Sequence, residues 1–141
     1  MIGVALSTKN LTKIRVIYAD TDAMGIVYHT NYIKWFEIGR AELLRELGMP
    51  YAQIESSGYN LPLTEVACHY LYPARYDEIV VVETEIVYLR RASLKFNYVI
   101  RDERQERVLV EGESVHACVN SQGKVVRITP DILAKIDPEK N

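Results

Sequence analysis

The chain has 141 residues and a formal net charge of −2 at pH 7, with 48% apolar and 26% charged residues. This length suits a single domain with its own hydrophobic core, and the composition is that of an ordinary soluble globular protein. Because no excess of positive charge would attract nucleic acid or an anionic membrane surface, neither is expected as a partner.

The apolar run at residues 2–6 is too short for a signal-peptide core, and no later stretch approaches the roughly 20 apolar residues of a membrane span. We therefore expect a cytoplasmic protein without an integral membrane segment. Cys68 and Cys118 both fall in strand-like segments, and they form no C-x-x-C pair. We expect buried free thiols rather than a disulfide, and no metal or redox site.

The first part of the chain predicts a short strand from Ile14 to Tyr18 and a helix from Asn31 to Leu47. Apolar residues recur in this helix at helical spacing, at Tyr32, Trp35, Phe36, Gly39, Leu43 and Leu47. Charged residues lie mostly off that stripe, at Lys34, Glu37, Arg40, Glu42 and Arg45. Gly48 and Pro50 end the helix. Large aromatic side chains on one stripe indicate that a sheet wraps this helix.

The second part reads mainly as strands, after a short helical turn at residues 51–56. The predicted strands cover residues 61–72, 79–89, 93–101 and 107–119. A hairpin turn at Ser121–Gly123 leads into a last strand, Lys124 to Ile128. A final short helix follows Thr129, with Pro130 at its first position. One strand, one long helix and then four or five antiparallel strands predict an α+β fold.

The densest cluster of reactive residue types lies between the first strand and the long helix. The segment from Tyr18 to Tyr32 combines two carboxylates, Asp20 and Asp22, with Gly25 and His29. Because this segment leads directly into a helix, its side chains lie beside free backbone amides and the positive end of the helix dipole. Such a position can polarise a carbonyl group.

The run from Tyr18 to Tyr32 resembles the signature of the hotdog-fold acyl-CoA thioesterases, within them most closely the 4-hydroxybenzoyl-CoA thioesterase family. That family includes the short-chain thioesterases associated with the Tol–Pal system. Two further stretches fit it, Tyr72–Glu78 and Arg90–Ser93, and the similarity covers a core of about residues 12–128. The resemblance implies a single hotdog domain over residues 1–141, with a curved five- to six-stranded antiparallel sheet around one central helix. It also implies a homodimer or a homotetramer (a dimer of dimers) with active sites at the subunit interface.

Thioester hydrolysis needs a carboxylate and a donor for the developing oxyanion. By the resemblance, Asp22 is the catalytic carboxylate, acting either as a nucleophile or as a general base; the competing interpretation is that Asp22 only caps its loop. The resemblance gives His29 a catalytic part, with its backbone N–H on the thioester oxygen and its imidazole positioning water or moving a proton. Asp20 is expected to be structural, bonded to loop amides.

The substrate-binding residues are assigned in the same way. Gly25 is expected to let the backbone approach the acyl group or adopt a positive φ, and Tyr28 to line the acyl pocket. The resemblance assigns Arg90, Arg91 and Ser93 to the coenzyme A phosphates, since guanidinium groups suit phosphate oxygens. It implies no metal and no other cofactor.

The predicted function is hydrolysis of an acyl-CoA to the free acid and coenzyme A. Two alternatives stay open: hydrolysis of acyl-carrier-protein thioesters, and a non-catalytic acyl-CoA-binding scaffold. A calcium loop is disfavoured because Met24 occupies the third ligand position. A serine hydrolase is disfavoured because Gly112–His116 lacks the second glycine of a nucleophile elbow and falls in a strand. His69 and His116 are expected to be structural.

Overall fold

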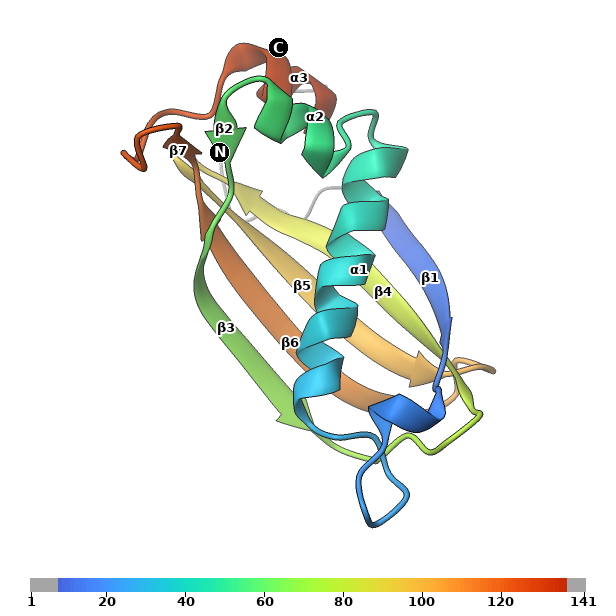
Figure 1. Cartoon of the computed structure of the whole chain (residues 1–141). Coiled ribbons are helices and arrows are strands. Elements are labelled where there is room, and N and C mark those ends of the chain that lie inside the picture. Colours follow the sequence, from blue (N-terminus) through green and yellow to red (C-terminus); the bar gives the residue numbers. More distant parts are fainter. Residues whose placement is uncertain (1–7, 137–141) are drawn as a thin grey trace.

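One long helix lies across the concave face of a curved antiparallel sheet (Figure 1). The computed structural model describes residues 8–136. The helix is α1, Thr30–Glu46, and the sheet has five strands in the order β1-β4-β5-β6-β3. The strand bounds are β1 Lys9–Arg15, β3 Leu63–Tyr70, β4 Ile79–Leu89, β5 Ser93–Asp102 and β6 Val108–Ala117. The predicted α+β arrangement is therefore confirmed.

Shorter elements close the end of the fold at which α1 finishes (Figure 1). They are α2 (Tyr51–Ser56), α3 (Pro130–Ile136) and a two-stranded sheet that pairs β2 (Tyr59–Asn60) with β7 (Val119–Asn120). Both short helices lie where the sequence predicts them. Among residues 8–136, no helix is long and apolar enough to cross a membrane.

The apolar stripe of α1 faces the sheet, as predicted. Its buried residues are Tyr32, Trp35, Phe36, Gly39, Leu43 and Leu44. The ring of Phe36 stacks on Tyr98 of β5, with centroids 4.2 Å apart. A Cβ atom at Gly39 would collide with Thr84 Oγ1 and lie 3.0 Å from Val82 Cγ1, both on β4. Glycine therefore sets how closely α1 approaches the sheet.

The alternation predicted for residues 93–101 is confirmed, since β5 buries one face. That face consists of Leu94, Phe96, Tyr98 and Ile100. Cys118 is a buried free thiol and Cys68 a partly buried one, so the chain forms no disulfide between them. Both cysteines therefore behave as ordinary small side chains, Cys68 on β3 and Cys118 directly after the end of β6.

Two predicted strands are wrong in detail. The first strand runs from Lys9 to Arg15 instead of Ile14 to Tyr18, because the chain turns into a 3-10 helix at Tyr18–Asp20. Residues 124–128 form no strand; they make only an isolated bridge, between Val125 and Val119. The backbone N–H of Ile128 instead donates to the carbonyl oxygen of Arg91, in the turn after β4, at 2.8 Å.

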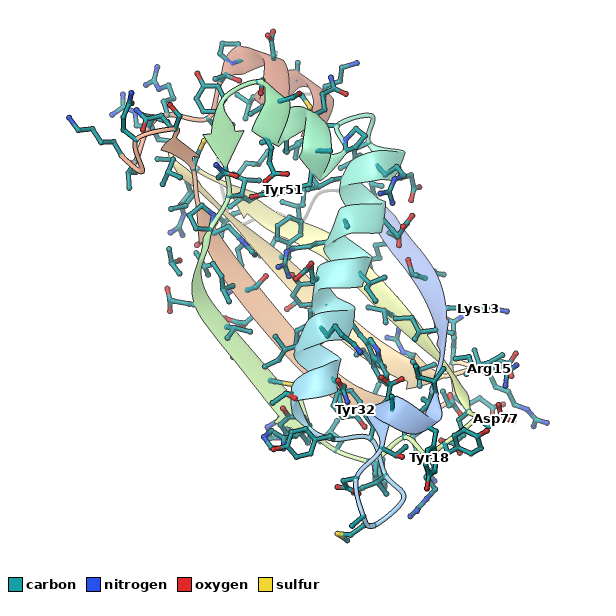
Figure 2. All side chains as sticks on the ribbon, viewed as in Figure 1. Lys13, Arg15, Tyr18, Tyr32, Tyr51 and Asp77 are labelled. Carbon is teal, nitrogen blue, oxygen red and sulfur yellow. The ribbon has the colours of Figure 1, made fainter. Side chains whose placement is uncertain are left out.

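The turn before β4 is tied to the end of β1. Arg15 Nη1 donates to the backbone oxygen of Asp77 at 2.6 Å and lies 3.2 Å from its carboxylate, and Figure 2 shows the two residues side by side. Close by, the rings of Tyr18 and Tyr76 meet edge to face with centroids 5.7 Å apart. These contacts anchor the start of the segment that leads to α1.

Candidate active site

The loop between β1 and α1 is organised around the buried side chain of Asp20. Its carboxylate accepts hydrogen bonds from the backbone N–H of Ile17 at 3.0 Å and from Lys34 Nζ at 3.1 Å. Its backbone oxygen accepts from the N–H of Tyr28 and from Asn31 Nδ2, both at 2.8 Å. Asp20 therefore joins the beginning and the end of the loop, which agrees with the structural role expected for it.

Asp22 lies in a tight turn within this loop and is partly buried. Its Oδ1 accepts a hydrogen bond from the N–H of Met24 at 2.8 Å and a longer one from the N–H of Ile26 at 3.4 Å. No donor among residues 8–136 bonds to Oδ2. Within the described residues, the carboxylate is thus oriented through Oδ1 alone.

Gly25 completes the turn with φ at +78°, and its N–H donates to the backbone oxygen of Asp22 at 3.0 Å. A Cβ atom at this position would meet nothing within 4 Å. The positive φ, and not a close approach of other protein atoms, is therefore what favours glycine in the free chain.

His29 is the residue directly before α1, and its side chain is exposed. Its backbone oxygen accepts a hydrogen bond from the hydroxyl of Tyr70, on β3, at 3.0 Å. Its imidazole packs on the ring of Tyr28, with centroids 4.4 Å apart. Among residues 8–136, no group accepts a hydrogen bond from the backbone N–H of His29. This amide at the N-terminus of α1 is available to an oxygen of a ligand.

A cavity of about 280 Å³ lies against this loop. It is lined by Ile26, Val27, His29, Tyr32, Tyr70, Leu71, Tyr72 and Pro73. Asp22, Gly25 and Tyr28 belong to the same loop but do not line the cavity, and Tyr28 is 47% exposed. The lining is apolar and aromatic, with few polar groups, which is typical of sites for small organic ligands.

Two of the three tyrosines that line the cavity form hydrogen bonds through their hydroxyl groups. Tyr32 accepts a hydrogen bond from the backbone N–H of Ala74 at 3.0 Å, and burial raises its pKa. Burial, together with the neighbouring Cys68, raises the pKa of Tyr70 to about 12. Tyr70 therefore remains a hydrogen-bond donor to His29 throughout the physiological pH range.

Arg90, Arg91 and Ser93 lie in and beside the turn between β4 and β5, at the opposite end of the sheet from the Asp22 loop (Figure 1). The backbone N–H of Arg90 donates to the oxygen of Ser93 at 2.8 Å, and its guanidinium covers the ring of Tyr88, 3.8 Å from the centroid. Both arginines are exposed, and no carboxylate among residues 8–136 forms an ion pair with them. One chain therefore does not bring these residues together with Asp22.

Tyr70, which contacts His29 across 41 positions of the chain, was not predicted as a site residue from the sequence. Its location just before the Tyr72–Glu78 motif was a visible signal, but its partner depends on how the end of β3 meets the start of α1. Arg40 was not predicted either, because its position in the sequence places it on the polar side of the helix. Arg40 is partly buried and donates to the hydroxyl of Tyr98 at 3.3 Å.

A curved antiparallel sheet around one helix, with an acid-bearing loop at the helix N-terminus, defines the hotdog class of folds. The family model described as thioesterase-like superfamily matches residues 16–136, and the chain belongs to this superfamily. Together with the relatives described next, this membership places the chain among the enzymes of the thioester-hydrolase class.

Known proteins agree with this assignment. The chain is 36% identical to the putative acyl-CoA thioesterase YneP of Bacillus subtilis, over 78% of this chain and 79% of that protein. It is 33% identical to the acyl-CoA thioester hydrolase YbgC of Escherichia coli, over 76% of this chain and 79% of that protein. The crystal structure of a DHNA-CoA thioesterase from Staphylococcus aureus superposes with a TM-score of 0.81 at 30% identity, covering 94% of this chain and 85% of that one.

Proposed function

We propose that the chain hydrolyses acyl-CoA thioesters to a carboxylic acid and coenzyme A, with Asp22 as the catalytic carboxylate. Family membership and the names of the relatives from Bacillus subtilis and Escherichia coli support the substrate class. The observation that carries the role of Asp22 is its half-satisfied carboxylate, fixed through Oδ1 by the N–H of Met24 and free at Oδ2. It stands in the same loop as the unused amide of His29.

In the proposed reaction, the thioester oxygen accepts a hydrogen bond from the backbone N–H of His29. The positive end of the α1 dipole stabilises the negative charge that develops on this oxygen. As a nucleophile, Asp22 attacks the carbonyl carbon and expels the coenzyme A thiolate, and water then hydrolyses the mixed anhydride. As a general base, Asp22 takes a proton from water while the water oxygen attacks the same carbon; the coenzyme A thiolate is then expelled and takes up that proton. The product acid and free coenzyme A are the same in both routes.

The carrier is proposed to bind through its phosphate groups to Arg90 and Arg91, with Ser93 as a further donor. Because these residues are remote from Asp22 in one chain, we infer that a complete site combines two protomers. The edge strand β3 supports this inference, since Leu63 and Val66 on it are 45% and 41% exposed. A second copy that adds to this edge would cover them. Sedimentation equilibrium should therefore find a homodimer or a homotetramer; a monomer at assay concentration would contradict the shared site.

The test of the proposed function is Asp22→Asn, assayed on a panel of acyl-CoA substrates with a reagent for the released thiol. We expect kcat to fall by about a hundredfold or more, because a principal catalytic group is lost. The matched control is Asp131→Asn, at an exposed position in the first turn of α3. Near-normal turnover of a folded Asp22→Asn variant would remove Asp22 from the mechanism.

A further inference from the structure

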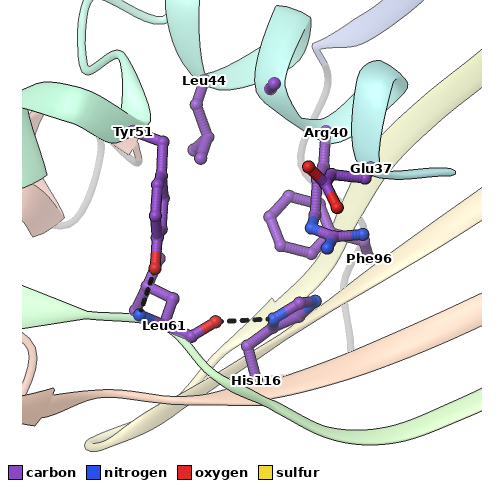
Figure 3. A pocket seen from close by; sticks show the side chains of 8 residues that line it. Glu37, Arg40, Leu44, Tyr51, Leu61, Phe96 and His116 are labelled. Carbon is purple, nitrogen blue, oxygen red and sulfur yellow. Dashed lines mark hydrogen bonds between the residues drawn. The ribbon is translucent and has the colours of Figure 1, made fainter. Parts of the chain in front are cut away.

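A second cavity of about 280 Å³ lies between the C-terminal half of α1, α2 and the sheet (Figure 3). It is lined by Glu37, Arg40, Ala41, Leu44, Tyr51, Leu61, Phe96 and His116. None of these residues lines the cavity beside the Asp22 loop. The thioesterase chemistry proposed above uses none of them, so this cavity requires its own explanation.

Hydrogen bonds connect two residues that line the cavity, His116 and Arg40, in series through Ser114 and Tyr98, which do not line it. His116 Nδ1 lies 2.9 Å from the backbone oxygen of Leu61, which only accepts, so Nδ1 carries the proton. Burial lowers the pKa of His116 to about 4, and Nε2 therefore accepts from Ser114 Oγ at 2.9 Å. Ser114 in turn accepts from the hydroxyl of Tyr98 at 2.5 Å, and Tyr98 accepts from Arg40 at 3.3 Å. These four side chains are consequently neutral except for the guanidinium of Arg40.

Arg40 is a partly buried cation without an acidic partner. Its one hydrogen bond to a side chain is donated to the neutral hydroxyl of Tyr98. Among residues 8–136, no carboxylate oxygen lies within 4.0 Å of the guanidinium, the limit for an ion pair. Glu37 also lines the cavity, but it is an exposed side chain on the same helix. A partly desolvated guanidinium beside apolar walls favours an anion, because the anion restores the interactions lost with water.

The remaining lining favours an apolar body attached to that anion. Leu44, Leu61 and Phe96 are buried hydrophobic residues, and Ala41 adds a small one. At about 30 Å³ per water molecule, a cavity of about 280 Å³ has room for about nine water-sized groups. A short fatty acid or a benzoic acid has this size, whereas a coenzyme A ester does not fit entirely inside.

We propose that this cavity is a binding site for small organic acids. The carboxylate lies on the guanidinium of Arg40, and the hydrocarbon body packs among Leu44, Leu61 and Phe96. Free acids of this kind are what a thioester hydrolase releases, so under the proposed function such ligands form at the enzyme itself. Acid binding itself requires no chemistry at Asp22.

The experiment is isothermal titration calorimetry of the full chain with hexanoate, benzoate and the uncharged hexanamide. Hexanoate should bind about tenfold or more tightly than hexanamide, because only the acid pairs with the guanidinium. Arg40→Met should weaken hexanoate binding by a similar factor, and Arg40→Lys by less, since it keeps the charge. Glu37→Gln should tighten binding severalfold, because it removes a competing negative charge. The control is Arg45→Met, at an exposed arginine of α1 that is paired with Glu42.

Several results would overturn the proposal. They are no hexanoate binding at all, equal binding of acid and amide, or undiminished affinity in Arg40→Met. If Arg40→Met does not fold, an unchanged affinity for hexanoate in both Arg40→Lys and Glu37→Gln would also overturn the proposal. Nuclear magnetic resonance locates the ligand: shifts confined to His29 and Tyr70, with none at His116, would also overturn the proposal. Asp22→Asn should leave acid binding intact, so a failure here is distinct from a failure of the proposed hydrolysis.

Discussion

The hydroxyl of Tyr70 donates to the backbone carbonyl oxygen of His29, and the two oxygens are 3.0 Å apart. Tyr70 is the last residue of β3, while His29 directly precedes α1. The hydrogen bond therefore attaches the first turn of the helix to the edge of the sheet. In the proposed mechanism the amide of His29 holds the developing oxyanion, so Tyr70 is a positioning residue for that amide.

We predict that Tyr70→Phe lowers kcat by about fivefold to tenfold with little change in KM. The lost hydrogen bond corresponds to about 1 kcal/mol of orientation at a group that acts mainly in the transition state. Steady-state kinetics on one acyl-CoA substrate measures the effect. Tyr72→Phe is the control, because Tyr72 lines the same cavity but contacts Arg107 through its ring face. Equal losses in both variants would mean that the hydroxyl of Tyr70 has no special part.

The double variant Arg90→Ala, Arg91→Ala tests the carrier site. We expect KM for an acyl-CoA to rise by about tenfold or more, since two charge-assisted contacts to phosphate are lost. KM for the same acyl group on pantetheine, which lacks the nucleotide phosphates, should stay unchanged. Arg104→Ala, an exposed arginine at the other end of β5, is the control. A rise of KM with both carriers would indicate a general disturbance instead of lost phosphate binding.

Thr84→Val should raise the free energy of unfolding by about 1 kcal/mol. Thr84 is 0% exposed, and within the described residues its hydroxyl has no hydrogen-bond partner. Valine has nearly the same shape, and it avoids the cost of burying an unpaired polar group. Urea denaturation measures the change. Thr64→Val is the control, because the Thr64 hydroxyl donates to the Val115 backbone oxygen at 3.0 Å, so no gain is expected there. A destabilised Thr84→Val variant would show that the hydroxyl contributes to the fold.

His116 should make stability depend on pH between about 4 and 6.5. Burial lowers its pKa from 6.5 to about 4 in the folded chain, so in this range the unfolded chain binds a proton that the folded chain does not. The contribution of this pKa difference to the free energy of unfolding is therefore complete above pH 6.5. It is lost as pH falls toward 4, a total of about 3 kcal/mol. Urea denaturation of the native chain and of His116→Gln across this range measures it. A difference between the two that does not change with pH would contradict a neutral buried ring.

Much of the fold follows from local patterns. The predicted helix, Asn31 to Leu47, differs from α1 by one residue at each end, because an aromatic stripe and Gly48 mark it clearly. The bounds predicted for β4 are those observed, because this long segment starts with a continuous apolar run, residues 79–82. In contrast, the predicted first strand begins five residues after the observed start of β1. The alternating polar residues of β1 look like an exposed segment in the sequence, and only pairing with β4 makes them a strand.

The candidate site is only partly visible in the sequence. The loop that carries Asp22 and His29 could be predicted because its reactive residues are neighbours in the chain. The contacts of Tyr70 and Arg40 could not, because both depend on packing between elements distant in sequence. Helical periodicity places Arg40 off the apolar stripe, but α2 and the sheet enclose that side of α1 with a cavity.

The Asp22 loop and the Arg90–Ser93 turn lie at opposite ends of the sheet (Figure 1), and this separation has a consequence for mixtures of two variants. If each active site combines Asp22 of one protomer with Arg90 and Arg91 of the other, then two inactive variants should restore activity when their subunits are mixed. Randomly reassembled dimers of Asp22→Asn with the double arginine variant would regain about a quarter of the intact centres. Mixed subunits no more active than the average of the two parents would instead mean that every protomer works alone.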